Sequence, residues 1–197
     1  MAVFFPTHLT LARIALIPVV VGLFYLKKEW GSWLAAGFFA VACFTDYLDG
    51  YYARTLRQTT QVGRFLDPIA DKLLIASTLL LLVGFDRVRG ISLIPALVIL
   101  CRELLVSGLR EFLAQTNIEM PVTQLSKWKT GVQMTALGVL IAGTPSMDFL
   151  YVHTLGLILL WCAAILTLVT GYGYFRQGVT HIQRSEVGDR RSERKRA

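Results

Sequence analysis

The sequence is built from long apolar blocks separated by short polar segments, and it lacks the short alternating pattern of β-strands. Each block approaches the roughly 20 residues that a helix needs to cross a bilayer. The blocks span residues 10–26, 33–53, 68–84, 91–113, 130–146 and 149–175. We therefore predict an all-α integral membrane protein with six transmembrane helices.

The polar segments between the blocks are too short to form a soluble domain, and no internal repeat is present. We therefore predict a single membrane domain over residues 1–197, with a basic tail from about residue 177. The chain has 20 Lys and Arg against 13 Asp and Glu. Next to a membrane, anionic lipid headgroups explain a basic tail better than nucleic acid does, so no nucleic-acid partner is predicted.

Basic residues are concentrated in alternate connections between the blocks. The connection between the second and third blocks contains Arg54, Arg57 and Arg64, and the tail from residue 184 has six basic and three acidic residues. The connections in between carry fewer basic residues or none. The positive-inside rule therefore predicts that both termini and the connection between the second and third blocks face the cytoplasm.

Four aspartates, Asp46, Asp49, Asp67 and Asp71, flank that same connection. On helices the first two are three residues apart and the last two are four apart, so each pair shares a helix face. Consecutive helices joined by a short loop pack antiparallel, which would bring both pairs together at the cytoplasmic edge. A charged side chain at membrane depth costs roughly 3 kcal/mol, and like charges repel, so the four carboxylates need neutralisation.

Carboxylate oxygens without His or Cys ligands favour hard divalent cations, so we predict a magnesium or manganese site. Structural ion pairs with Arg54, Arg64 and Lys72 are the alternative, but these cations are too few to be sure of pairing all four carboxylates. The small residues Gly50 and Ala53 would leave room for a phosphorylated ligand. Helix packing through small residues explains them equally well, and the spacing does not decide between the two.

Residues 46–71 match the pattern D-x2-D-G-x2-A-R-x8-G-x3-D-x3-D at every position. This pattern resembles the signature of the CDP-alcohol phosphotransferase family. Four stretches also resemble the branch of the family whose acceptor alcohol is glycerol 3-phosphate: PTHLTLARIALIP, FLDPIADKLLIA, CRELLVSGLRE and SKWKTGVQMTAL. Together they cover most of residues 6–137, whereas the last two blocks and the tail are similar only in hydropathy.

The resemblance implies a homodimeric six-helix enzyme of the bacterial inner membrane, with a two-metal site at the cytoplasmic face. It would transfer a phosphatidyl group from CDP-diacylglycerol to glycerol 3-phosphate and release CMP, a step of phospholipid biosynthesis. The aspartates Asp46, Asp49, Asp67 and Asp71 would bind two Mg²⁺ or Mn²⁺ ions, and Asp71 would also be the catalytic base. CDP-diacylglycerol would be bound by Thr10, Gly50, Ala53, Arg54, Thr60 and Gly63.

The acceptor implied by the resemblance carries a phosphate, so a second cluster of positive charge is expected. We predict that Arg102, Arg110 and Lys127 bind this phosphate. Arg102 lies deep in an apolar block, where an unpaired cation is costly, and its helix neighbour Glu103 is predicted to pair with it only poorly. Lys129 is predicted to extend along the helix to the membrane boundary instead.

For Arg13, within the first block, interhelical pairing and substrate contact are equally consistent with the sequence.

Other functions remain as alternatives. A divalent-cation transporter would carry acidic residues near the membrane midplane on several helices, unlike this chain. A non-catalytic lipid-binding scaffold would tolerate the loss of an aspartate, and none is missing. Within the family, the alternatives are cardiolipin synthase and the phosphatidylserine, phosphatidylcholine or phosphatidylinositol-phosphate branches.

Overall fold

The computed structural model describes residues 5–26, 29–56, 61–115, 124–143 and 150–193. Within these ranges the chain is helical, as predicted, and each of the six apolar blocks corresponds to one long helix. The elements are α1 (Phe5–Tyr25), α2 (Glu29–Leu56), α3 (Gln61–Gly84), the short 3-10 helix η1 (Gly90–Ser92), α4 (Leu93–Gln115), α5 (Gln124–Ala142) and α6 (Leu150–Glu193).

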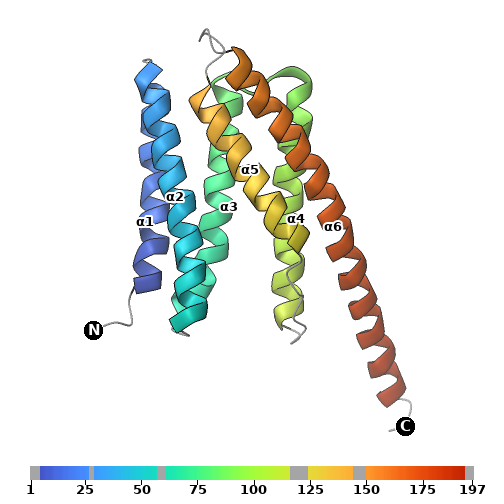
Figure 1. The fold of residues 1–197 in the computed structure, drawn as a ribbon. Helices are drawn as coiled ribbons and strands as arrows, with labels where there is room; N and C mark the ends of the chain where they lie inside the picture. Colours follow the sequence, from blue (N-terminus) through green and yellow to red (C-terminus); the bar gives the residue numbers. More distant parts are fainter. Residues whose placement is uncertain (1–4, 27–28, 57–60, 116–123, 144–149, 194–197) are drawn as a thin grey trace.

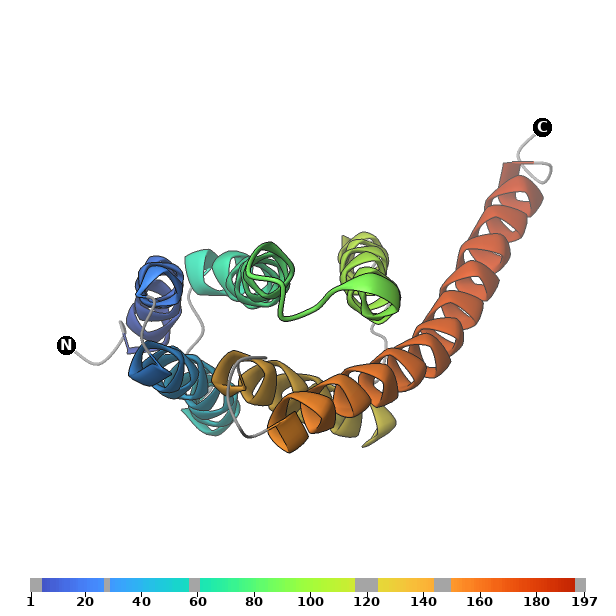
Figure 2. The same cartoon turned by 90° about the horizontal axis from the view of Figure 1, so that it is seen from above.

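The six helices form two layers of three (Figure 2). Helices α1, α3 and α4 make one layer, and α2, α5 and α6 make the other. In Figure 1, α1 begins, α2 ends, α3 begins and α6 ends at the lower end of the bundle. The aspartate-containing ends of α2 and α3 therefore lie at the same end of the bundle, as predicted, but α2 packs mainly on α1 and α5, and α3 on α1 and α4, rather than on each other.

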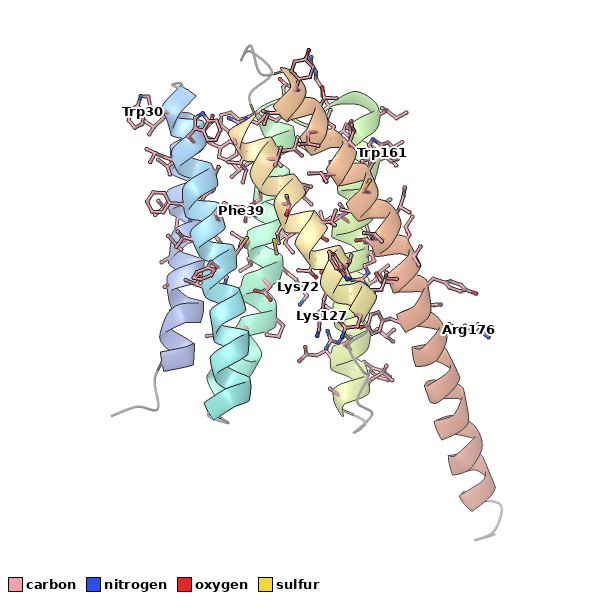
Figure 3. All side chains as sticks on the ribbon, in the orientation of Figure 1. Trp30, Phe39, Lys72, Lys127, Trp161 and Arg176 are labelled. Atoms are coloured by element: carbon pink, nitrogen blue, oxygen red, sulfur yellow. The ribbon has the colours of Figure 1, made fainter. Side chains whose placement is uncertain are left out.

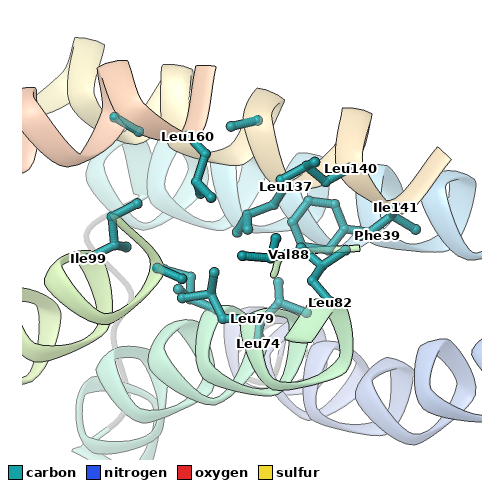
Figure 4. Packing of buried hydrophobic residues seen from close by; sticks show 14 of the residues in the cluster. Phe39, Leu74, Leu79, Leu82, Val88, Ile99, Leu137, Leu140, Ile141 and Leu160 are labelled. Carbon is teal, nitrogen blue, oxygen red and sulfur yellow. The ribbon is translucent and has the colours of Figure 1, made fainter. Parts of the chain in front are cut away.

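The core between the layers consists of buried aliphatic and aromatic side chains from all six helices, including Val20 of α1, and Figure 4 shows part of it. They include Phe39 of α2, Leu82 of α3, Ile99 of α4, Leu137 of α5 and Leu160 of α6. Helices α5 and α6 approach closely at Gly156, where an added Cβ would lie 2.8 Å from the side chain of Leu140. Small residues at such contacts let membrane helices pack backbone to backbone.

The outside of the bundle is apolar, which a water-soluble protein rarely shows over such an area. Large side chains that are more than two-thirds exposed include Leu80, Ile91, Leu105, Trp128, Tyr151 and Tyr172. Among the described residues, two helical segments, Gly90–Ala114 and Tyr151–Arg176, are long and apolar enough to cross a bilayer. Shorter apolar segments are Leu11–Tyr25 and Trp30–Thr45. These features agree with a bilayer as the surrounding solvent.

A buried arginine in the turn between α3 and η1 holds the upper end of the bundle together. Arg87 donates hydrogen bonds to the carbonyl oxygens of Leu140, at 3.2 Å, and Ile141, and to Ser32 Oγ at 2.7 Å. Its guanidinium also lies 4.8 Å from the ring centroid of Phe24. The carbonyls belong to the last turn of α5, where carbonyl oxygens have no N–H donors within their own helix. Arg87 therefore ties α5 to the first three helices.

Helix α6 is much longer than its apolar block. The sequence placed the last span at residues 149–175, but α6 continues to Glu193, a total of 44 residues. Figure 1 shows its last turns extending beyond the other helices. The predicted span agrees with the apolar segment Tyr151–Arg176, and the helix continues beyond it because an apolar pattern marks where a helix meets lipid and not where the helix stops.

Candidate active site

A cavity of about 540 Å³ opens in the lower half of the bundle between α3, α4 and α5. Lys72, labelled in Figure 3, marks its α3 wall. Its described lining from α3 is Asp67, Pro68, Asp71, Lys72 and Ile75. From α4 it is Arg102, Glu103, Val106, Ser107, Arg110, Glu111 and Ala114, and from α5 it is Ser126, Lys129, Thr130, Gln133 and Met134.

The α3 wall supplies two carboxylates from one helix face. Asp67 and Asp71, four residues apart, both line the cavity, as their spacing predicted. Arg13 of α1 donates a hydrogen bond from Nη1 to Asp71 Oδ1 at 2.7 Å, and Arg13 is only 1% exposed. Of the two roles left open for Arg13, the structure shows interhelical pairing. The charge-assisted bond holds the Asp71 carboxylate at the cavity wall.

The other two aspartates belong to α2, whose backbone is described through Leu56, but their side chains lie outside the described residues. The same holds for Thr10, Gly50, Ala53, Arg54 and Gly63, and Thr60 lies between the described ranges. Within the described part of the chain, no three His, Cys, Asp or Glu side chains are grouped as a metal site. The structure thus describes two of the four predicted ligands, Asp67 and Asp71.

The α4 and α5 walls share one carboxylate between two cations. Glu103 Oε1 accepts hydrogen bonds from Arg102 Nη1, at 3.2 Å, and from the Lys129 ammonium. The prediction of poor pairing between Arg102 and Glu103 was wrong, because the long arginine side chain bends back to its neighbour where water is excluded. The prediction for Lys129 was also wrong. It is only 4% exposed and points toward α4, because burying its charge requires a carboxylate partner.

Arg102 also ties α4 to α6. Its Nη2 donates to Thr170 Oγ1 at 2.9 Å, and its guanidinium lies 5.9 Å from the ring centroid of Tyr174. Gly171 makes this approach possible, since an added Cβ there would lie 3.0 Å from Arg102 Cγ. Arg102 is therefore held by several contacts in the cavity wall.

The remaining cations differ in how available they are to a ligand. Lys72 Nζ donates to the carbonyl oxygen of Pro68 at 2.7 Å. Arg110 lines the cavity, is exposed, and has no ion-pair partner within the described ranges. Lys127, labelled in Figure 3, is exposed and does not belong to the cavity lining. Arg110 is thus the lining cation best placed to meet an incoming anion.

Sequence reasoning missed Glu103, Lys129 and Gln133 as residues of the site. A signal was present for the last two: Lys129, just before the fifth apolar block, and Gln133, within it, are four residues apart, so they share one face of α5. The resulting cavity combines the α3 carboxylates Asp67 and Asp71 with cations from all three helices, and α4 adds the carboxylates Glu103 and Glu111. Such an arrangement suits a small ligand that carries both a phosphate and a reactive hydroxyl.

The donor set on the α3 wall fits a divalent cation. Asp67 and Asp71 offer only carboxylate oxygens, which magnesium and manganese prefer, and no described His or Cys lines the cavity.

Comparison with known proteins agrees with this chemistry. Residues 3–169 match the sequence profile of the family described as CDP-alcohol phosphatidyltransferase. A CDP-diacylglycerol--glycerol-3-phosphate 3-phosphatidyltransferase of Rickettsia typhi is 46% identical over 176 residues, covering 89% of this chain and 97% of its own. The enzyme of the same name from Cereibacter sphaeroides is 34% identical, covering 90% and 96%.

A further relative carries a different name. A cardiolipin synthase (CMP-forming) of Oryza sativa is 39% identical over 189 residues, covering 87% of this chain and 56% of its own length. The profile match spans most of the chain, and the relatives named above exceed 30% identity over nearly all of it. The chain belongs to the CDP-alcohol phosphatidyltransferase family, whose members are membrane-embedded enzymes.

Proposed function

We propose that this protein is a CDP-diacylglycerol–glycerol-3-phosphate 3-phosphatidyltransferase, that is, a phosphatidylglycerophosphate synthase. It transfers the phosphatidyl group of CDP-diacylglycerol to glycerol 3-phosphate and forms phosphatidylglycerophosphate and CMP. The observation that carries this proposal is the cavity in which Asp67 and Asp71 are opposed by Arg102, Lys129 and Arg110. The Rickettsia typhi relative supports the proposal, because it bears this enzyme name and is similar to this chain over almost its whole length.

In the proposed reaction, an oxygen of the acceptor's free primary hydroxyl attacks the lipid-side phosphorus of CDP-diacylglycerol. A new oxygen–phosphorus bond forms, the bond from that phosphorus to the bridging oxygen breaks, and CMP leaves with the bridging oxygen. The hydroxyl proton passes to the carboxylate of Asp71. The Arg13 hydrogen bond supports this role, because it fixes the orientation of the base.

The metal site is proposed at Asp46, Asp49, Asp67 and Asp71, with two Mg²⁺ or Mn²⁺ ions. Two such ions, when bound, stabilise negative charge on both the attacking and the leaving side of a phosphoryl transfer. The described carboxylates Asp67 and Asp71 support the assignment, since they share one helix face on the cavity wall. The protein contributes positioning and electrostatics, which supply most of the rate in this class of reaction.

The nucleotide part of the lipid substrate is proposed to lie between α1, α2 and α3. The residues assigned to it are Thr10, Gly50, Ala53, Arg54, Thr60 and Gly63. The acceptor phosphate is proposed to bind Arg110 and Lys127, with Arg102 behind them. Arg110 has the strongest support, because it lines the cavity without an ion-pair partner among the described residues.

The membrane arrangement is proposed to comprise six spans in one domain over residues 1–197. The lower end of the bundle, with the basic tail, would face the cytoplasm of a bacterial inner membrane. This orientation lets the acyl chains of the substrate stay in the bilayer while glycerol 3-phosphate enters from water. A homodimer is proposed from the family resemblance, and light scattering of the purified protein in detergent would measure it.

An acceptor panel tests the proposed function. Purified protein is incubated with CDP-diacylglycerol and Mg²⁺ or Mn²⁺, and CMP release is measured with each alcohol. We expect release with glycerol 3-phosphate to exceed that with serine, inositol phosphate or phosphatidylglycerol. Preference for phosphatidylglycerol would support the cardiolipin synthase alternative, which the rice relative keeps open. No CMP release with any alcohol would contradict the transferase function.

A second prediction concerns the acceptor phosphate. Arg110→Ala should raise the KM for glycerol 3-phosphate by about 10- to 100-fold, because a charge-assisted contact to phosphate contributes about 1.5–3 kcal/mol. Lys127→Ala should have a smaller effect, since Lys127 lies outside the cavity lining. The KM for CDP-diacylglycerol should change little in both. Arg110→Lys should restore only part of the loss, because an ammonium cannot form the bidentate contact.

If both alanine variants keep the parent KM for glycerol 3-phosphate, these cations do not bind the acceptor. Arg89→Ala is a matched control, because Arg89 is an exposed arginine in the turn before η1, at the opposite end of the bundle.

A further inference from the structure

One cavity residue, Gln133, is buried without hydrogen-bond partners. It lies on α5 and is 0% exposed, and it belongs to the cavity lining. Neither Nε2 nor Oε1 of its side chain has a hydrogen-bond partner within the described part of the chain. Buried polar groups in native proteins are nearly always hydrogen-bonded, so an amide in this position points to a partner that arrives from outside the protein.

A second buried polar group, on another helix, cannot satisfy this amide fully. Thr167 of α6 also has a buried hydroxyl without a partner among the described residues. If the Gln133 side chain turned toward it, one hydroxyl would pair with only one of the two amide atoms. Lys129, one helical turn earlier on the same face, already donates to Glu103. At least one polar atom of Gln133 therefore remains for a ligand in the cavity.

The chemistry of an amide identifies the group that it would bind. A neutral amide both donates and accepts, as an alcohol hydroxyl does, whereas a phosphate only accepts and a metal ion only binds lone pairs. Among the lining residues, Gln133 is the single uncharged polar side chain that is fully buried. The carboxylates and cations of the cavity wall match the reacting hydroxyl and the phosphate of the acceptor, and the remaining uncharged polar side chains, Ser107, Ser126 and Thr130, are only partly buried or exposed.

Glycerol 3-phosphate has one more polar group, the hydroxyl on its central carbon. We propose that Gln133 binds this central hydroxyl and thereby selects a glycerol phosphate over acceptors that lack it. The inference rests on the proposed function, which it deepens. Gln133 is a positioning residue: it holds the middle of the acceptor so that the free primary hydroxyl lies toward Asp71 and the phosphate toward Arg110.

The test compares two acceptors, glycerol 3-phosphate and 3-hydroxypropyl phosphate, which lacks only the central hydroxyl. We expect the wild-type protein to use glycerol 3-phosphate with a kcat/KM about 10- to 100-fold higher, because the analogue leaves a buried amide unpaired. Gln133→Met should lower kcat/KM for glycerol 3-phosphate by a similar factor and leave the analogue nearly unchanged. The ratio between the two acceptors should therefore fall toward one.

This ratio separates recognition from stability, since a loosened fold would slow both acceptors alike. Gln124→Met is the matched control: Gln124 is an exposed glutamine at the start of the same helix, outside the cavity lining, and the ratio should be unchanged. Gln133→Asn keeps the amide but shortens it, so we expect an intermediate ratio. It also serves if Gln133→Met fails to fold, as judged by thermal unfolding in detergent.

Two results would overturn the inference. One is a wild-type protein that turns over both acceptors equally, which needs no variant. The other is a folded Gln133→Met protein that keeps the wild-type ratio. Failure of the proposed function gives a different result, namely no CMP release with either acceptor.

Discussion

Asp67→Asn is expected to abolish metal-dependent release of CMP, by at least about a thousandfold, while the protein still folds and inserts. Asp67 lines the cavity on the same face of α3 as Asp71. Replacing one carboxylate oxygen by an amide nitrogen removes a metal ligand and a negative charge together. A bound metal ion contributes several kcal/mol of charge stabilisation, and each 1.4 kcal/mol corresponds to about a tenfold change in rate.

The measurement is CMP release over a titration of Mg²⁺ or Mn²⁺, with thermal unfolding in detergent as the check on folding. Asp86→Asn is the matched control, because Asp86 lies in the turn after α3 at the other end of the bundle. Its φ of 57° is left-handed, a conformation that asparagine accepts as readily as aspartate. Asp46→Asn and Asp49→Asn should behave like Asp67→Asn. Near-normal activity in any two of these three variants contradicts the two-metal site.

Asp71→Asn should lose turnover but keep much of its affinity for CDP-diacylglycerol. The variant lacks the base that accepts the hydroxyl proton, whereas the other three aspartates remain. The buried Arg13, which donates to Asp71 Oδ1 at 2.7 Å, can donate to the asparagine carbonyl oxygen instead, so the wall should keep its shape. Single-turnover CMP release measures the chemical step, and calorimetric titration with CDP-diacylglycerol measures binding.

Turnover within about tenfold of the parent, a deficit of only about 1.4 kcal/mol, would show that Asp71 is not the base. Arg54→Ala provides the opposite pattern, since it should weaken binding of the nucleotide lipid more than it slows the chemistry. A variant that loses both binding and folding would be recognised by its thermal unfolding. In that case Asp71→Ser, which also removes the carboxylate, allows the same comparison.

The number and order of the helices follow directly from the apolar blocks. A long uninterrupted apolar segment in a bilayer adopts a helix, because a helix pairs its own backbone N–H and C=O groups. Six such segments therefore predict six helices. Helix ends are less determined. The polar residues after the sixth block continue α6 to Glu193, because a helix that leaves the membrane keeps its internal hydrogen bonds in water.

Local spacing predicted part of the site and missed the contacts between helices. Asp67 and Asp71 share a face because they are four residues apart, a relation that any helix fixes. The bond from Arg13 to Asp71 joins residues 58 positions apart and depends on how α1 packs against α3. The Lys129–Glu103 pair likewise joins residues 26 apart. Hydropathy alone favours the membrane boundary for a lysine, and only the placement of α4 and α5 around the cavity reveals its buried carboxylate partner.

The contacts of Arg87 impose an order on biosynthesis. Its acceptors at Leu140 and Ile141 lie 53 and 54 residues later in the chain, so the guanidinium is made and inserted before they exist. During that interval the N–H groups of Arg87 that later donate to α5 have no native acceptors. Burying them without acceptors would cost free energy. The upper end of the first four helices can therefore complete its native hydrogen bonds only after α5 has been synthesised. The fifth helix therefore supplies the acceptors for Arg87 late in synthesis, and a chain that ended before α5 would leave those donors without native partners.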